Sequence, residues 1–291
     1  MYPTYNTYQV TLHVTDTNGC QYTVSHPVVV LPHPTAFFSF TTPNCLGDIT
    51  HFTDLSQNPA QNGYLQQWTW NFGDGSAPVT INFPSSSNIT HTYSLPGTYT
   101  VSLVTTNNRG CSDSFQAPIT ITRKPKSAFS WWSNCQGQSA LFYDHSIQNG
   151  GGQIASWSWD FGDPSSGALN LSSLQNPQHT YTSPGSFYVR LVVTNLEGCT
   201  DTLGQNVSVK TAPAADFTHA PGCLVSPTLF WADTTLINIQ ATATYLWDFG
   251  DGNTSNIRST QHTYIAAGTY NVTLTITDTA GCEGPEPAVL L

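Results

Sequence analysis

Hydrophobic and polar residues alternate strictly in four stretches of the chain. In the last stretch, Tyr270, Val272, Leu274 and Ile276 are separated by single polar residues, and this period of two predicts a strand with one buried and one solvated face. Each stretch ends in a polar turn closed by Gly-Cys, which indicates that a further strand returns as a hairpin. The four stretches are YPTYNTYQVTLHVTDTNGC, YSLPGTYTVSLVTTNNRGC, YTSPGSFYVRLVVTNLEGC and YIAAGTYNVTLTITDTAGC.

A second predicted strand carries aromatic residues at alternate positions and ends at Gly-Asp. It occurs as WTWNFGDG at 68–75, WSWDFGDP at 157–164 and YLWDFGDG at 245–252. Alternate residues of a strand share one face, so we expect the rings to fill the core, each contributing on the order of a few kcal/mol. The predicted core residues are Trp68, Trp70, Phe72, Trp157, Trp159, Phe161, Tyr245, Trp247 and Phe249.

The spacing of the aromatic strands defines a unit of about ninety residues, which is large enough for one β-sandwich core. We expect complete units at 34–124, 125–211 and 212–291. Tyr2 aligns with Tyr93, so residues 1–33 are expected to be the last strands of a truncated unit in a longer protein. No helical period is found. The predicted fold class is therefore all-β, with tandem sandwich domains in a linear array.

Charge and cysteine content narrow the range of partners. Only 8% of the residues are charged. The chain has seven Lys and Arg residues in total and a net charge of −10, which argues against nucleic acid or an anionic membrane surface as a partner. No apolar run is long enough for a membrane-spanning helix, so no membrane insertion is expected within this segment. The seven cysteines form no CxxC pair. This excludes common zinc sites and indicates disulfides in an extracellular or cell-surface protein.

The acidic turns raise the possibility of calcium binding. A calcium site needs six to eight oxygen ligands, whereas an Asp before Gly also bonds the backbone of its own turn. We favour the structural interpretation, and we predict neither a metal nor a cofactor. The aspartates concerned are Asp54, Asp74, Asp144, Asp163, Asp233 and Asp251.

Catalytic signatures are not found in the sequence. The chain has no G-x-S-x-G elbow, no HExxH motif and no Gly-rich phosphate loop, so we expect no enzyme activity. Three His-Thr-Tyr triplets begin at His91, His179 and His262. Each unit offers one such histidine without a second at ligand spacing, so a structural role is favoured, with the tyrosine bonding backbone at a corner between strands.

Adjacent tryptophans at 131 and 132 are the candidate glycan contact. Neighbouring residues of a strand point to opposite faces, so Trp131 and Trp132 cannot both lie in the core. An exposed indole can stack on a sugar ring, and this pair occurs in only one unit.

Together these motifs resemble the PKD domain family, named for the polycystic kidney disease protein. The resemblance rests on W-x-W-[ND]-F-G-D-[GP], HTY at 91–93, 179–181 and 262–264, the PGTYTV and AGTYNV strands and the Gly-Cys turns, and it covers essentially the whole chain. It implies immunoglobulin-like β-sandwiches that serve in spacing, adhesion or accessory binding, as in secreted Bacteroidota surface proteins. Asn71 and Pro164 depart from the family pattern, and Pro164 predicts a different turn in the second complete unit.

The cysteines allow two pairing schemes. Pairing within units would join Cys45 to Cys111, Cys135 to Cys199 and Cys223 to Cys282. The topology that the resemblance implies puts the first turn and the last hairpin at opposite ends of strands roughly 20 Å long, beyond the roughly 7 Å that a disulfide can span. We therefore favour pairing between successive units: Cys45 with Cys199 and Cys135 with Cys282, leaving Cys20, Cys111 and Cys223 for partners outside the segment.

The expected function is a non-enzymatic extracellular structural or adhesion array. It would act as a stiff spacer or filament-forming segment of a larger cell-surface or secreted protein. Its expected partners are neighbouring copies of the same domain or chain, as in a homopolymer, and possible further partners are a polysaccharide or a cell surface. The alternative is a set of accessory polysaccharide-binding modules of a secreted hydrolase.

Overall fold

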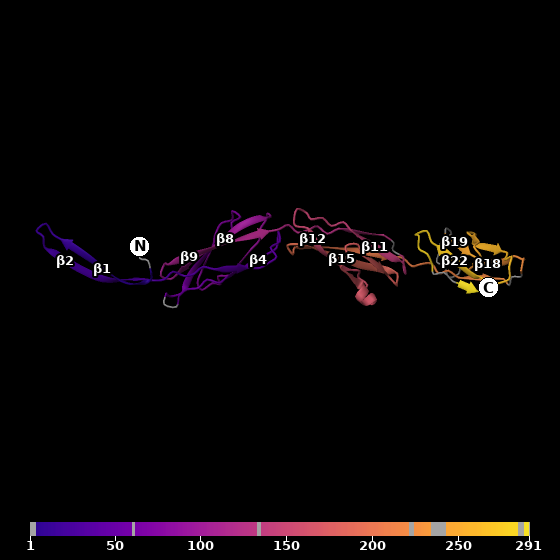
Figure 1. Ribbon diagram of the computed structural model, residues 1–291, viewed down its shortest axis with the longest axis horizontal. Coiled ribbons are helices and arrows are strands. Elements are labelled where there is room, and N and C mark those ends of the chain that lie inside the picture. Colours follow the sequence, from indigo (N-terminus) through magenta and orange to yellow (C-terminus); the bar gives the residue numbers. More distant parts are fainter. Residues whose placement is uncertain are drawn as a thin grey trace. The chain divides into compact units, whose positions relative to one another are not determined.

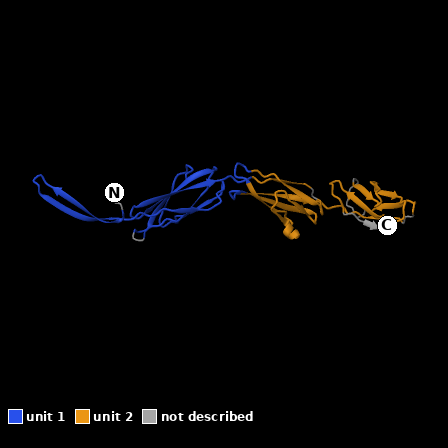
Figure 2. Ribbon diagram, viewed as in Figure 1, with its two compact units in different colours: residues 1–125, 148–153, 195–199 blue, residues 126–147, 154–194, 200–291 orange. Residues whose placement is uncertain are grey.

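A computed structural model describes residues 4–59, 62–132, 135–220, 224–233, 243–284 and 288–290. Nearly all regular structure is β-strand, as the alternation predicted (Figure 1). The chain separates into two compact units (Figure 2): residues 1–125, 148–153 and 195–199 form one, and residues 126–147, 154–194 and 200–291 form the other.

The first strands form an isolated hairpin. Strand β1 (Asn6–Thr15) pairs antiparallel with β2 (Gln21–Val30), from Asn6 opposite Val30 to Thr15 opposite Gln21. The two strands make a sheet of their own. Most of their side chains are exposed.

The first complete domain consists of two antiparallel sheets that share one core. The smaller sheet has the order β3-β4-β7 and the larger one the order β6-β5-β8-β9. Buried residues of both sheets form a single cluster, as in a sandwich. The strands are β3 (Phe38–Phe40), β4 (Thr50–Asp54), β5 (Leu65–Asn71), β6 (Val79–Asn82), β7 (Ile89–His91), β8 (Gly97–Asn107) and β9 (Ser112–Ile121).

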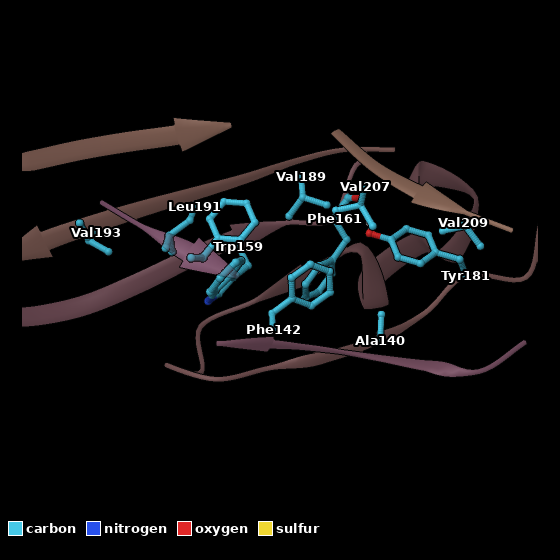
Figure 3. Close-up of a cluster of buried hydrophobic side chains, with 11 residues drawn as sticks. Ala140, Phe142, Trp159, Phe161, Tyr181, Val189, Leu191, Val193, Val207 and Val209 are labelled. Atoms are coloured by element: carbon cyan, nitrogen blue, oxygen red, sulfur yellow. The ribbon is translucent and has the colours of Figure 1, made fainter. Parts of the chain in front are cut away.

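The second complete domain repeats this topology. Its sheets have the orders β10-β11-β14 and β13-β12-β15-β16. The strands are β10 (Phe129–Trp132), β11 (Ser139–Asp144), β12 (Ile154–Asp160), β13 (Leu171–Ser172), β14 (Gln178–Thr180), β15 (Gly185–Asn195) and β16 (Thr200–Val209). Figure 3 shows Trp159 of β12 and Phe142 of β11, one from each sheet, among the side chains of the core, which include Val189 and Leu191 of β15.

The third complete domain has the sheet orders β17-β18-β21 and β20-β19-β22-β23. Its core cluster again joins both sheets, with Trp247 and Phe230 fully buried. The strands are β17 (Phe217–His219), β18 (Thr228–Ala232), β19 (Thr244–Asp248), β20 (Thr254–Ser255), β21 (Ser259–His262), β22 (Asn271–Thr277) and β23 (Ala288–Leu290).

The turn after the aromatic strand differs in the second domain, as Pro164 predicted. Gly75 and Gly252 have positive φ angles of 86° and 90° in the first and third domains. Proline cannot adopt such an angle, because its ring fixes φ near −65°. The chain therefore continues into a short 3-10 helix, η1 (Pro164–Asn170), before it returns as β13.

Candidate functional site

The alternating aromatic side chains lie in the three cores. Of the nine residues, seven are buried, and Trp157 and Tyr245 are half-buried against the same clusters. One tryptophan of each domain is fully buried, and its indole N–H donates to a backbone carbonyl. The bonds are Trp70 to Ser87 at 3.1 Å, Trp159 to Leu174 at 2.9 Å and Trp247 to Ile257 at 2.9 Å. These three indoles are interior packing with their N–H groups satisfied, whereas the buried indole N–H of Trp68 has no hydrogen-bond partner among the described residues.

The aspartate of each Gly-Asp turn contacts the histidine of the His-Thr-Tyr triplet. The carboxylate oxygen lies 2.7 Å from the imidazole Nε2 in Asp74–His91, 3.1 Å in Asp163–His179 and 2.7 Å in Asp251–His262. Each imidazole also stacks on the phenylalanine of the aromatic strand, with ring centroids 3.9 to 4.5 Å apart. The histidine is thus held by an acid on one side and a ring on the other.

The tyrosine of each triplet bonds backbone, as its expected corner role requires. Its hydroxyl donates to the carbonyl of the same phenylalanine, at 3.2 Å from Tyr93, 3.0 Å from Tyr181 and 3.1 Å from Tyr264. Burial and the negative charge of Asp251 raise the pKa of Tyr264 to about 12. These phenols therefore stay neutral donors.

The turn aspartates are ionised more readily than free aspartate. Burial opposes the charge of Asp74, but hydrogen bonds from Ser76 and His91 outweigh it and lower its pKa from 3.8 to about 2. The pKa values of Asp163 and Asp251 are lowered by hydrogen bonds of the same kind, again against burial. A carboxylate that accepts several hydrogen bonds is stabilised in its charged form.

This arrangement does not match that of a nucleophile and its base. The Ser76 hydroxyl donates to Asp74 at 2.6 Å, so it touches the carboxylate rather than His91. In a Ser-His-Asp triad the imidazole lies between the hydroxyl and the acid. The contact between Asp74 and His91 instead links a turn to a strand.

Two of the remaining candidate aspartates are also used for local bonding. Asp54 accepts the backbone N–H of Ser56, and Asp144 accepts that of Ser146 and the indole N–H of Trp157. In the part of the chain that the structure describes, no three His, Cys, Asp or Glu side chains gather as metal ligands would. Within the same residues, no helix is long and apolar enough to cross a membrane.

The Gly-Cys turns share one geometry. In each, a side-chain oxygen of the Asn or Asp four residues earlier accepts the backbone N–H of the cysteine, at 2.7 to 3.0 Å. The acceptors are Asp16 for Cys20, Asn107 for Cys111, Asn195 for Cys199 and Asp278 for Cys282. Each cysteine is therefore presented in the same way at the tip of a hairpin.

Two disulfides join the first turn of one domain to the hairpin tip of the next. Cys45 bonds Cys199 with a Cα–Cα distance of 5.6 Å, and Cys135 bonds Cys282 with 5.4 Å. Cys20 and Cys111 are free thiols, exposed and half-buried respectively. Cys223 lies outside the described residues.

The linker after the first complete domain is held by backbone bonds beside its disulfide. Thr122 donates to the carbonyl of Asn44 at 3.0 Å and accepts from the N–H of Leu46 at 2.9 Å. The side-chain amide of Asn195 donates to the carbonyl of Arg123 at 3.3 Å. The linker thus contacts the turn that carries Cys45 and the hairpin that carries Cys199.

The adjacent tryptophans face opposite ways on β10. Trp131 packs against the core of the second domain, whereas Trp132 is 73% exposed. Trp132 lies opposite Leu141 of β11, and both Leu141 and Tyr143 are exposed on that strand. The outer face of this sheet therefore carries a small apolar platform.

Comparisons with known proteins match the repeated units. A family model for the PKD domain matches residues 32–122, 132–211 and 210–288. Polycystin-1 of Homo sapiens is 30% identical over 146 residues, which are 43% of this chain and 3% of polycystin-1. A microbial collagenase of Vibrio alginolyticus is 29% identical over 134 residues, 40% of this chain and 16% of the collagenase.

The PKD1 domain of the Vibrio cholerae metalloprotease PrtV is a similar solved structure. It is 32% identical with a TM-score of 0.26, covering 30% of this chain and 99% of that domain. The chain spans less than a fifth of the length of either curated relative.

Proposed function

Because the chain belongs to the PKD domain family, we propose that it is a non-enzymatic extracellular array that acts as a stiff spacer or filament-forming segment of a larger surface or secreted protein. Its partners would be neighbouring copies of the same domain or chain. The disulfide between Cys45 and Cys199 carries the proposal. It fixes a joint that would otherwise rotate about a short linker, since domain interfaces within a chain ordinarily permit relative motion.

The chemistry of the chain supports the extracellular part of the proposal. Disulfides persist in oxidising compartments outside the cytoplasm. The surface has few charged residues for its size, 8% of the chain.

Single-molecule energy transfer between two dyes tests whether the joint between the first and second complete domains is fixed. Dyes are attached through noncanonical amino acids at Leu95 and Leu169, which are exposed loop and 3-10 positions of the first and second domains. We expect the combined Cys45→Ser and Cys199→Ser variant to broaden the distance distribution at least twofold, because the joint regains rotational freedom.

Cys111→Ser serves as the matched control, because that cysteine belongs to neither disulfide. Circular dichroism checks that the domains stay folded in both variants. An equally narrow distribution with and without the disulfide would contradict the proposed stiff spacer.

The exposed indole of Trp132 favours a second candidate, polysaccharide binding as an accessory module of a secreted hydrolase. An indole beside Leu141 and Tyr143 offers an apolar face on which a sugar ring can stack. On a glycan array, Trp132→Ala would lower retention at least tenfold. Phe83→Ala, which removes an exposed ring elsewhere, would leave retention unchanged. No glycan retained by the wild-type protein would rule this candidate out.

A further inference from the structure

The turn that distinguishes the second domain contains the peptide bond between Asp163 and Pro164. Asp163 is 3% exposed, whereas Pro164 is exposed to solvent. A peptide bond to proline is a tertiary amide whose nitrogen carries no hydrogen, so this nitrogen cannot attack the aspartate side chain. The reaction that remains open to the pair is attack by the carboxylate on its own backbone carbonyl.

The backbone carbonyl of Asp163 accepts two hydrogen bonds from one residue. Ser166 donates to the carbonyl oxygen through its backbone N–H at 3.0 Å and through its hydroxyl at 2.7 Å. Two donors on a carbonyl oxygen stabilise the negative charge that develops there when a nucleophile attacks the carbon. The carbonyl of this peptide bond is therefore activated.

The carboxylate of the same residue is held in place and charged. His179, whose side chain is 3% exposed, lies 3.1 Å from one carboxylate oxygen, and the Ser165 hydroxyl donates to the other. Burial opposes the charge of Asp163, but these hydrogen bonds outweigh it and lower its pKa below the ordinary 3.8. An ionised aspartate is an established nucleophile in covalent catalysis.

The amino side of Asp163 is fixed as well. Its backbone N–H donates to the side-chain oxygen of Asn170 at 2.7 Å, and the side-chain amide of Asn170 donates to Asp160 at 2.9 Å. The nucleophile and the carbonyl thus belong to one residue that is bonded at its N–H, its C=O and its carboxylate. Holding two reacting groups together removes much of the entropic part of the barrier.

We propose that the chain cleaves its own bond between Asp163 and Pro164. A carboxylate oxygen of Asp163 attacks the backbone carbonyl carbon of the same residue and closes a cyclic anhydride. The bond from this carbon to the Pro164 nitrogen breaks, and the nitrogen takes up a proton from solvent. Water then opens the anhydride. The net reaction consumes one water and yields an α-carboxylate at residue 163 and a secondary ammonium at Pro164. It occurs once in each chain and involves no other substrate.

Both disulfides span the proposed cleavage site, because each joins a cysteine before the bond to one after it. The pairs are Cys45–Cys199 and Cys135–Cys282. The two products, residues 1–163 and 164–291, would therefore stay covalently joined. The reaction would open the turn and create a new amino terminus without parting the array, and it would be visible as fragments only after the disulfides are reduced.

The test incubates the full chain at about pH 5, where solvent supplies protons and the carboxylate is still ionised, and follows it by mass spectrometry. After reduction, we expect fragments 1–163 and 164–291. Without reduction, the protein should gain only the mass of one water. Cleavage should be at least tenfold faster than in a synthetic peptide of residues 157–172, which has the bond but not the fold. Equal rates in the chain and the peptide would overturn the proposal.

The bond itself is tested by changing either of its residues. Pro164→Gly creates the Asp-Gly bond that the other two domains have at Gly75 and Gly252, and it should abolish cleavage. Asp163→Asn, which removes the carboxylate, should slow it at least tenfold. The bonds that follow the other two turn aspartates serve as internal controls and should stay intact. Cleavage there at the same rate, or in Pro164→Gly, would contradict the mechanism.

The hydrogen bonds to the carbonyl are tested separately. Ser166→Ala removes the hydroxyl donor and should slow cleavage at least fivefold. Ser173→Ala, which changes an exposed serine beyond the turn, should leave the rate within twofold. Circular dichroism checks that both variants are folded. Equal rates for the two serine variants, or no fragments from the wild-type chain, would overturn the proposal.

Discussion

At the residue scale, one carboxylate in each domain has two tasks. Asp74 bonds the backbone N–H of Ser76 in its own turn, as expected for an aspartate before glycine, and also bonds His91 of a separate strand. The second bond was not anticipated from the sequence. It joins the end of the aromatic strand to the smaller sheet and places the imidazole over Phe72.

Removing the charge of Asp74 should therefore destabilise the first complete domain. A hydrogen bond to a charged group contributes roughly 2 kcal/mol, so we expect Asp74→Asn to lower the free energy of unfolding at pH 7 by about that amount, as measured by urea titration. Asp48→Asn is the control, because its ion pair with Lys124 is exposed and such pairs contribute little.

The same variant has a defined pH dependence. The folded pKa of Asp74 is about 2, below its ordinary 3.8, so its stabilisation is complete well above pH 3.8 and is lost as the pH falls through 2. The wild type and Asp74→Asn should consequently converge in stability toward pH 2. A difference that stays constant from pH 7 to pH 2 would contradict this role.

At the element scale, the end of the aromatic strand depends on a close backbone approach. Gly73 has a φ of +77°, and a Cβ there would lie 2.5 Å from the carbonyl oxygen of Thr100 in β8. Gly75, two residues later, has a φ of +86°, but a Cβ there would meet nothing within 4 Å. The two glycines share a backbone conformation and differ in available space.

This pair predicts unequal costs for the same substitution. Gly75→Ala should lower the free energy of unfolding by about 1 kcal/mol, because a residue with a Cβ disfavours a left-handed conformation. Gly73→Ala should lower the free energy of unfolding by at least about 2 kcal/mol more, because the end of β5 and β8 must also separate to make room for the Cβ. Thermal unfolding of the two variants measures the difference. Equal costs would show that the close approach to β8 is unimportant.

At the scale of the whole molecule, folding and linkage are separate. Each complete domain has its own cluster of buried residues, so each can fold around its own aromatic strand. The disulfides join hairpin tips to first turns, 154 and 147 residues apart in the chain. They contribute to the connection between successive domains rather than to any one core.

The sequence by itself determined the all-β fold, the repeated unit and the family. These follow from local patterns: alternation of two, regular recurrence of the aromatic strand, and Gly-Cys turns whose chemistry lies within a few residues. Trp70 and Leu103 could be placed on inward faces for the same reason, because a strand's period fixes which side chains share a face.

Only the tertiary structure decided the contacts between distant segments. The separations of Asp74 from His91 and of Asp251 from His262 are 17 and 11 residues, so no fixed spacing marks the pair in the sequence. Local patterns also present Cys111 and Cys199 in the same turn. The pairing of Cys199 with Cys45 was favoured from the topology that the family resemblance implies, and not from the residues around either cysteine. Such contacts depend on loop length and on neighbouring domains, and neither is encoded in the few residues around the site.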